Sequence, residues 1–148
     1  MNDLNQPAGV LLPFPNTSYH APWRLMIWRP AHVLDDSLLD QVIDFVEFEE
    51  RTLGSSFNRF LDFSALTEIH LKIGHVFKIS ERRREVAASH DPVKGAIYAS
   101  TVIGFGMARL YEHMMEGSQI DVRAFRELAA AAEWLGAPVE VLHAAPSN

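Results

Sequence analysis

The chain has 148 residues, of which 48% are hydrophobic and 22% charged, as expected for one globular domain. Its 13 Lys and Arg against 19 Asp and Glu give a net charge of −6, which disfavours nucleic acid binding because phosphate backbones are negative. The absence of cysteine excludes disulfides, thiolate catalysis and zinc–thiolate or iron–sulfur centres.

The sequence suggests a cytoplasmic protein with no membrane span. No apolar stretch approaches the roughly 20 residues that a spanning helix needs, and the first residues lack the features of a signal peptide. Residues 1–22 contain four prolines, which predicts an arm and not a helix or a central strand. Within it, the apolar residues of 10–14 are expected to lie on the body, and 17–20 are expected to form a short edge strand.

The first half of the domain alternates strand and helix patterns. Residues 23–28 are large and apolar or aromatic, which predicts a strand. Residues 36–51 repeat apolar side chains at helical spacing and predict an amphipathic helix. A second strand is expected over 58–63 and a second helix over 71–88, and 64–71 is expected to contain a turn.

The second half continues the alternation. Residues 95–99 are uncharged, as expected for a strand whose faces are both covered by helices. A third helix over 101–116, a strand over 119–125 and a fourth helix over 126–135 follow, with 137–148 as a tail. Two helices begin beside possible N-caps, namely Asp35 or Asp36 and Ser100 or Thr101. The order β-α-β-α-β-α-β-α predicts an α/β fold with a mainly parallel central sheet and flanking helices.

The third helix has two contrasting faces. Its predicted inner face is Ile103, Gly106, Met107, Leu110 and Met114. Gly104 and Gly106 do not fit a phosphate-binding loop because both lie inside the helix, and close packing on the sheet explains Gly106 better. Phe105, Arg109 and Glu112 project away from the core, a combination typical of partner surfaces.

Several stretches match a known pattern. Phe60–Ile69 resembles a strand that ends in Leu-Asp-Leu-Ser before a turn and a helix, as in the anti-sigma-factor-antagonist (STAS) family. Gly104–Tyr111, Val122–Phe125 and Ala132–Gly136 are similar to the SpoIIAA-like branch of that family. The resemblance covers 23–136 and implies a SpoIIAA-like fold.

One departure from the family pattern affects the expected function. In the antagonists, the turn after the Leu-Asp-Leu-Ser strand carries a serine that is phosphorylated, whereas this chain has His70-Leu71-Lys72-Ile73 there. A phosphorylation switch acts by adding negative charge at one site. The resemblance therefore implies a protein without the usual switch, in which Ser64 or Thr67 is the only substitute hydroxyl nearby.

No catalytic or metal-binding constellation is visible. The seven histidines, at 20, 32, 70, 75, 90, 113 and 143, include no pair at the helical spacing of metal ligands. The basic run Lys78–Glu85 is interpreted as a solvated helix face. We therefore expect no metal, no cofactor and no enzymatic activity.

The sequence predicts a regulatory or interaction module that binds a protein partner or a second copy of itself through Phe105, Arg109 and Glu112. The alternative is a domain that binds a small apolar molecule or a lipid, because the STAS fold resembles the lobe of Sec14-type lipid carriers. Residues 10–14 with Trp23 and Trp28 would then line the site, and a pocket of a few hundred cubic ångströms would be needed. An enzyme with an unrecognised site is the third possibility.

Overall fold

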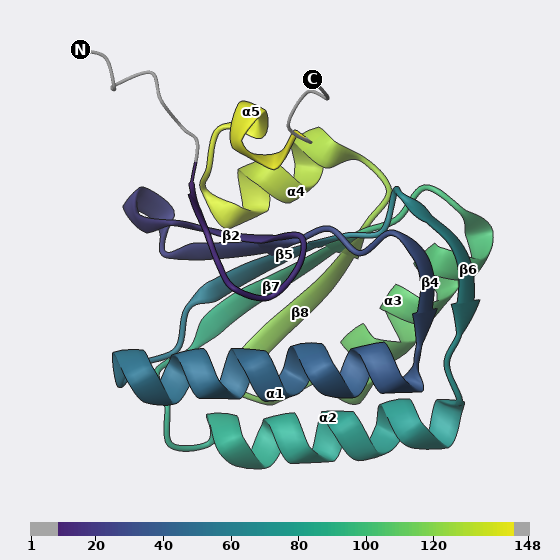
Figure 1. Ribbon diagram of the computed structural model, residues 1–148, viewed down its shortest axis with the longest axis horizontal. Coiled ribbons are helices and arrows are strands. Elements are labelled where there is room, and N and C mark those ends of the chain that lie inside the picture. The colour runs from purple at the N-terminus through teal and green to yellow at the C-terminus, as the bar shows by residue number, and fades with distance from the viewer. Residues whose placement is uncertain (1–8, 144–148) are drawn as a thin grey trace.

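The computed structural model describes residues 9–143 and places most of the strands in one six-stranded sheet (Figure 1). The strand order is β1-β2-β3-β5-β7-β8. These strands are β1 (Val10–Leu11), β2 (Thr17–His20), β3 (Leu25–Trp28), β5 (Asn58–Asp62), β7 (Val93–Tyr98) and β8 (Ile120–Phe125). β1 and β2 pair antiparallel, as do β2 and β3, and the other three pairs are parallel. The predicted mainly parallel sheet is therefore confirmed.

Helices cover both faces of this sheet, as Figure 1 shows. The helices are α1 (Asp36–Leu53), α2 (Ile73–Ala87), α3 (Val102–Met114), α4 (Leu128–Leu135) and α5 (Val139–Leu142), with a short 3₁₀ turn η2 (Ala21–Trp23). The first three helices lie on one face, and α4 and α5 lie on the other. Within the described part of the chain, no helix has the length and apolar character to cross a membrane.

The covering of both faces explains why β3 is wholly apolar. Along β3, Met26 and Trp28 join the hydrophobic cluster beneath α1–α3, and Leu25 and Ile27 join the cluster beneath α4 and α5. All four are buried, because successive side chains of a strand point to opposite faces and each face here is covered.

The helix starts expected from local chemistry are found. The Asp35 carboxylate accepts a hydrogen bond from the backbone N–H of Leu38 at 2.9 Å and caps α1. The Thr101 hydroxyl accepts one from the N–H of Gly104 at 3.0 Å and caps α3. In both cases a short polar side chain satisfies an amide that the first turn leaves free.

Two features were not expected from the sequence. β4 (His32–Asp35) and β6 (Leu66–His70) form a separate two-stranded parallel sheet at one end of the molecule (Figure 1). α5 lies within the stretch assigned to the tail, where Val141 and Leu142 are buried against the cluster beneath α4. Residues 17–20, which were expected to form an edge strand, form β2. β2 is not at the edge of the sheet, because β1 pairs with its outer side.

The rotation of α3 about its axis differs from the predicted one. Ile103 is 70% exposed and Gly106 is also exposed, so their assignment to the inner face is wrong. The buried positions are Gly104 and Ala108, which shifts the inner face by about one residue, or about 100°. A Cβ on Gly104 would lie 2.8 Å from Thr101 Oγ1, whereas a Cβ on Gly106 would have no neighbour within 4 Å. Close packing is therefore the role of Gly104.

Candidate functional site

The turn between β6 and α2 holds the position at which the family pattern has its phosphorylated serine. Here the N–H of Lys72, the residue before α2, donates to Asp36 Oδ1 at 3.1 Å, so a carboxylate from α1 lies at the N-terminus of α2. A negative group is favourable there because the first amides of a helix carry partial positive charge. The Thr67 hydroxyl donates to the backbone oxygen of His32 at 3.0 Å. Ser64 is exposed.

The three predicted surface residues on α3 have different surroundings. Arg109 is largely exposed and lies 3.6 Å from Glu112. Glu112 also accepts a hydrogen bond from the N–H of Ala124, on β8, at 2.9 Å. Phe105 is half-buried against the core, and the Arg126 guanidinium lies 5.3 Å from its ring centre. The structure thus pairs Arg109 with Glu112 and gives Phe105 and Glu112 partners within the chain.

A more exposed apolar feature lies in the first turn of the same helix. Val102 and Ile103 are 78% and 70% exposed. They border an open hollow of about 510 Å³ between β6 and α3, which we call the β6–α3 hollow. Leu66 and Ile69 of β6 line its other side. The sequence did not predict this surface, because helical periodicity assigned Ile103 to the inner face of the helix.

β6 contributes a strand edge as well as side chains to this region. It pairs in parallel with β4, and within residues 9–143 no other strand pairs with it. Such an edge presents N–H and C=O groups that can pair with another extended chain.

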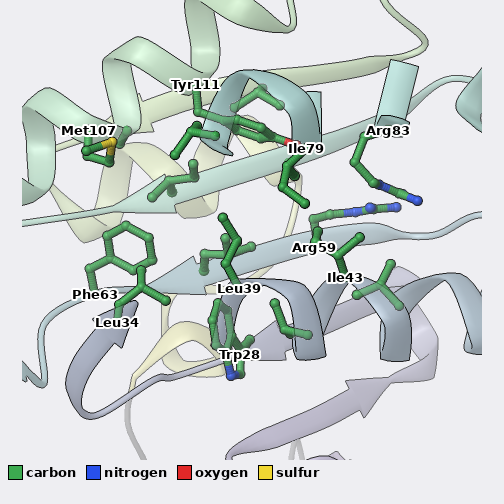
Figure 2. A pocket seen from close by; sticks show the side chains of 18 of the residues that line it. Trp28, Leu34, Leu39, Ile43, Arg59, Phe63, Ile79, Arg83, Met107 and Tyr111 are labelled. Atoms are coloured by element: carbon green, nitrogen blue, oxygen red, sulfur yellow. The ribbon is translucent and has the colours of Figure 1, made fainter. Parts of the chain in front are cut away.

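An internal cavity of about 90 Å³ lies between the main sheet and α1–α3 (Figure 2). Its lining is almost entirely apolar and includes Trp28, Leu34, Val46, Phe63, Ile97 and Met107. The polar residues in the lining are Arg59, Arg83 and Tyr111. Figure 2 shows the Tyr111 hydroxyl directed toward the end of the cavity where the two arginines lie.

A buried ionic network closes that end of the cavity. Glu50 Oε2 lies 3.0 Å from Arg59 Nη2 and 3.1 Å from Arg83 Nη2, and it accepts a hydrogen bond from Ser56 at 2.7 Å. Burial alone would raise the pKa of Glu50, but the hydrogen bond from Arg83 and the charge of Arg59 outweigh it and hold the pKa at about 2. Burial raises the pKa of the Tyr111 phenol, against the lowering effect of both arginines.

The basic run of α2 is therefore not a solvated face throughout. Arg83 is 1% exposed and binds Glu47 and Glu50 of α1 at 3.1 Å each. Arg82 binds Glu47 and Asp44 at 2.7 Å each. The interpretation of this run as solvated is wrong for Arg83, because the carboxylates that pair with it come from another helix and not from its own.

Two of the histidines lie beside carboxylates in the structure. His75 on α2 lies 2.6 Å from Asp40 on α1, and His70 lies 2.6 Å from Glu68. Among residues 9–143, no group of three or more His, Cys, Asp or Glu side chains is arranged to hold a metal ion.

The arrangement of strands and helices matches a solved structure. An uncharacterized protein from the DUF3478 family with a SpoIIAA-like fold, from Shewanella loihica PV-4, aligns with 86% of this chain and 92% of its own, with a TM-score of 0.50. This chain has a SpoIIAA-like fold. The sequence identity is 12%, so the likeness to that SpoIIAA-like protein concerns the fold alone. No protein-family model matches the chain, and no curated protein matches it by sequence.

Proposed function

We propose that this SpoIIAA-like chain is a non-enzymatic interaction module that receives an extended apolar segment of a partner protein in the β6–α3 hollow. The observation that carries the proposal is the adjacent pair Val102 and Ile103, both largely exposed beside a hollow and an unpaired strand edge. Exposed apolar side chains that cluster at a concave surface are typical of binding sites.

The strand edge determines what kind of segment fits. An extended peptide adds to a sheet edge through main-chain hydrogen bonds, and its alternate side chains enter pockets beside the edge. Added to β6, such a peptide would direct apolar side chains toward Val102 and Ile103. Fully burying each of these two residues contributes up to about 1.5–3 kcal/mol. A helical partner would leave the groups at the edge of β6 without hydrogen bonds.

Phe105, Arg109 and Glu112 extend the proposed surface along α3. Arg109 is exposed on the same helix as Val102 and is available to a carboxylate of the partner. Phe105 and Glu112 hold this part of the helix in place through Arg126 and through the N–H of Ala124.

A lipid-binding role for the internal cavity is less well supported. Sites for drug-sized ligands have volumes of about 300–1,000 Å³, and the internal cavity has about 90 Å³. Trp28 lines this cavity, but Trp23 packs against the cluster on the other face of the sheet. A lipid chain would therefore require a large opening of α1–α3 from the sheet.

Selection of displayed random 12-residue peptides on the full chain tests the interaction role. We expect enrichment of peptides with alternating apolar residues, and we expect the selected peptide to perturb the NMR signals of residues 66–70 and 102–104. Val102→Asp with Ile103→Asp should abolish binding. The control, Val10→Asp with Leu11→Asp, changes the exposed apolar pair of β1 and should retain it.

Three outcomes would contradict the proposal. Enriched peptides that bind the Val102→Asp/Ile103→Asp variant as well as they bind the original chain would place the site elsewhere. A selection that enriches nothing would remove the peptide-binding role. A dimer in sedimentation velocity that this variant dissociates would make a second copy of the chain the occupant.

A further inference from the structure

The internal cavity beneath α1–α3 is separate from the β6–α3 hollow, and its size is unusual for a core. A protein interior normally has few voids larger than one water molecule. One water needs about 10–15 Å³ measured in this way, so a cavity of about 90 Å³ has room for about six to nine water-sized spheres. A molecule of about six non-hydrogen atoms fits this space.

The chemistry of the wall disfavours a cluster of water molecules. Each buried water needs two to four polar partners, and the walls formed by α1, β5, β7 and α3 supply mainly aliphatic and aromatic carbon. Apolar cavities of this kind stay dry and accept small apolar molecules.

One corner of the cavity is polar. Arg59 is buried, and its Nη2 donates to Glu50, Ser56 and the backbone oxygen of Phe57 at 2.9–3.0 Å. Its Nε is buried without a hydrogen-bond partner, and it is the one such side-chain atom among residues 9–143. Leaving a buried donor unpaired is costly. Protein atoms close Nε off from the cavity. Tyr111 also lines the cavity, and its hydroxyl, which is directed toward the same end (Figure 2), is the donor that a molecule in the cavity can reach.

The charges at this corner are already balanced. Arg59 and Arg83 face the carboxylates of Glu47 and Glu50, which lie within 3.1 Å of them. A charged ligand would leave one buried charge uncompensated, at a cost of several kcal/mol. A neutral ligand keeps the balance.

We infer that this cavity is a binding site for a small neutral molecule of about six non-hydrogen atoms, apolar except for one oxygen acceptor that receives a hydrogen bond from the Tyr111 hydroxyl. The inference does not depend on the proposed interaction role, because the linings of the two sites have a single residue in common, Phe63. Failure of either experiment leaves the other unaffected.

Cyclopentanone and methylenecyclopentane are matched probes, since they differ by the replacement of a carbonyl oxygen with a CH₂ group. In NMR titrations of the full chain, both should shift the methyl signals of Ile97 and Ile120, which line the cavity.

Tyr111→Phe keeps the ring and removes only the hydroxyl. It should weaken cyclopentanone binding roughly fivefold relative to methylenecyclopentane binding, the effect of one net hydrogen bond. A ratio unchanged by Tyr111→Phe would overturn the assignment of the polar corner.

Filling the cavity is the second test. Ala108 is a buried alanine of α3 that lines the cavity, and Ala131 is a buried alanine of α4 on the opposite face of the sheet. Ala108→Leu should abolish binding of both probes, and Ala131→Leu should leave it intact. Absence of methyl shifts with both probes up to their solubility limits would overturn the inference, as would binding that survives in folded Ala108→Leu. If Ala108→Leu does not fold, the titrations of the original chain and of Tyr111→Phe decide.

Discussion

Two glycines of α3, Gly104 and Gly106, differ in how closely other atoms pack against them. A side chain at Gly104 would meet Thr101 Oγ1 at 2.8 Å and Ala99 Cβ at 3.2 Å, whereas one at Gly106 would meet nothing within 4 Å. Glycine in an exposed helix interior costs about 1 kcal/mol relative to alanine. Gly106 therefore carries this cost with no packing benefit within the described chain.

Alanine substitutions at these two positions should have opposite effects. We expect Gly106→Ala to raise the free energy of unfolding by about 0.5–1 kcal/mol, since alanine restricts the unfolded chain and meets no neighbour. We expect Gly104→Ala to lower it, because the added methyl is forced against the N-cap side chain. Urea unfolding of both variants measures the difference, and an equal response at the two positions would show that the rotation of α3 is not as described.

Glu50 makes the stability of the fold depend on pH in the acid range. Its pKa falls from 4.5 to about 2 on folding, because Arg83 and Arg59 outweigh the effect of burial. A depressed carboxylate pKa stabilises the fold fully above about pH 4.5, and this contribution is lost as the pH falls toward 2. The shift corresponds to about 3 kcal/mol.

Replacing the carboxylate should remove this dependence. We expect Glu50→Gln to cost about 3–5 kcal/mol at pH 7, because two buried guanidinium groups lose their common partner. The loss of stability between pH 5 and pH 3 should then be smaller in Glu50→Gln than in the original chain. Glu85→Gln, on the exposed side of α2, is the control and should leave the pH profile unchanged. Parallel profiles for the original chain and Glu50→Gln would mean that other carboxylates cause the acid sensitivity.

Among the elements, β8 shows how one helix protects an edge strand. β8 ends the main sheet, so one of its edges has no partner strand within the described residues. The N–H of Ala124 donates to Glu112 on α3 at 2.9 Å, and the N–H of Ile120 donates to the Ser118 hydroxyl at 3.1 Å. Side-chain acceptors on an edge reduce its tendency to pair with other chains.

Removing the Glu112 acceptor should expose this edge. We expect Glu112→Ala to increase hydrogen exchange at the Ala124 amide at least about tenfold, since a hydrogen bond to a charged group is worth about 1.5–3 kcal/mol. Glu116→Ala changes an exposed carboxylate 3.5 Å from His113 and should leave that amide unaffected. Equal protection of Ala124 in both variants would contradict the role of Glu112 at the edge.

Across the whole molecule, two hydrophobic clusters share one sheet. Trp28 lies in the cluster beneath α1–α3, and Trp23 and Trp134 pack against the cluster beneath α4 and α5. Alternate residues of the same strands supply both clusters, so loss of the sheet would expose both together. We therefore expect one cooperative unfolding transition.

Tryptophan fluorescence can follow each cluster separately. Trp28→Phe leaves the two reporters on the α4 side, and Trp23→Phe with Trp134→Phe leaves only Trp28. In each variant the urea midpoint from fluorescence should coincide with the midpoint from far-UV circular dichroism. A fluorescence midpoint that departs from the circular dichroism midpoint in either variant would show that the two faces unfold independently.

The sequence by itself determined the features that depend on neighbours a few residues apart. The strand and helix periods of 23–135 and the caps at Asp35 and Thr101 follow from contacts within about four residues, so they were predictable. The SpoIIAA-like fold was predicted from the alternation of these elements together with the motifs in Phe60–Ile69, Gly104–Tyr111, Val122–Phe125 and Ala132–Gly136.

Only the tertiary structure decided the features built from distant segments. The β4–β6 pair, the burial of Arg83 and its bonds to Glu47 and Glu50 join residues more than 30 positions apart. The rotation of α3, which exposes Val102 and Ile103, depends on packing against the sheet. Helical periodicity determines which side chains share a face, but not which face meets the core. The orientation of α3 places Val102 and Ile103 at the β6–α3 hollow and Ala108 in the wall of the internal cavity.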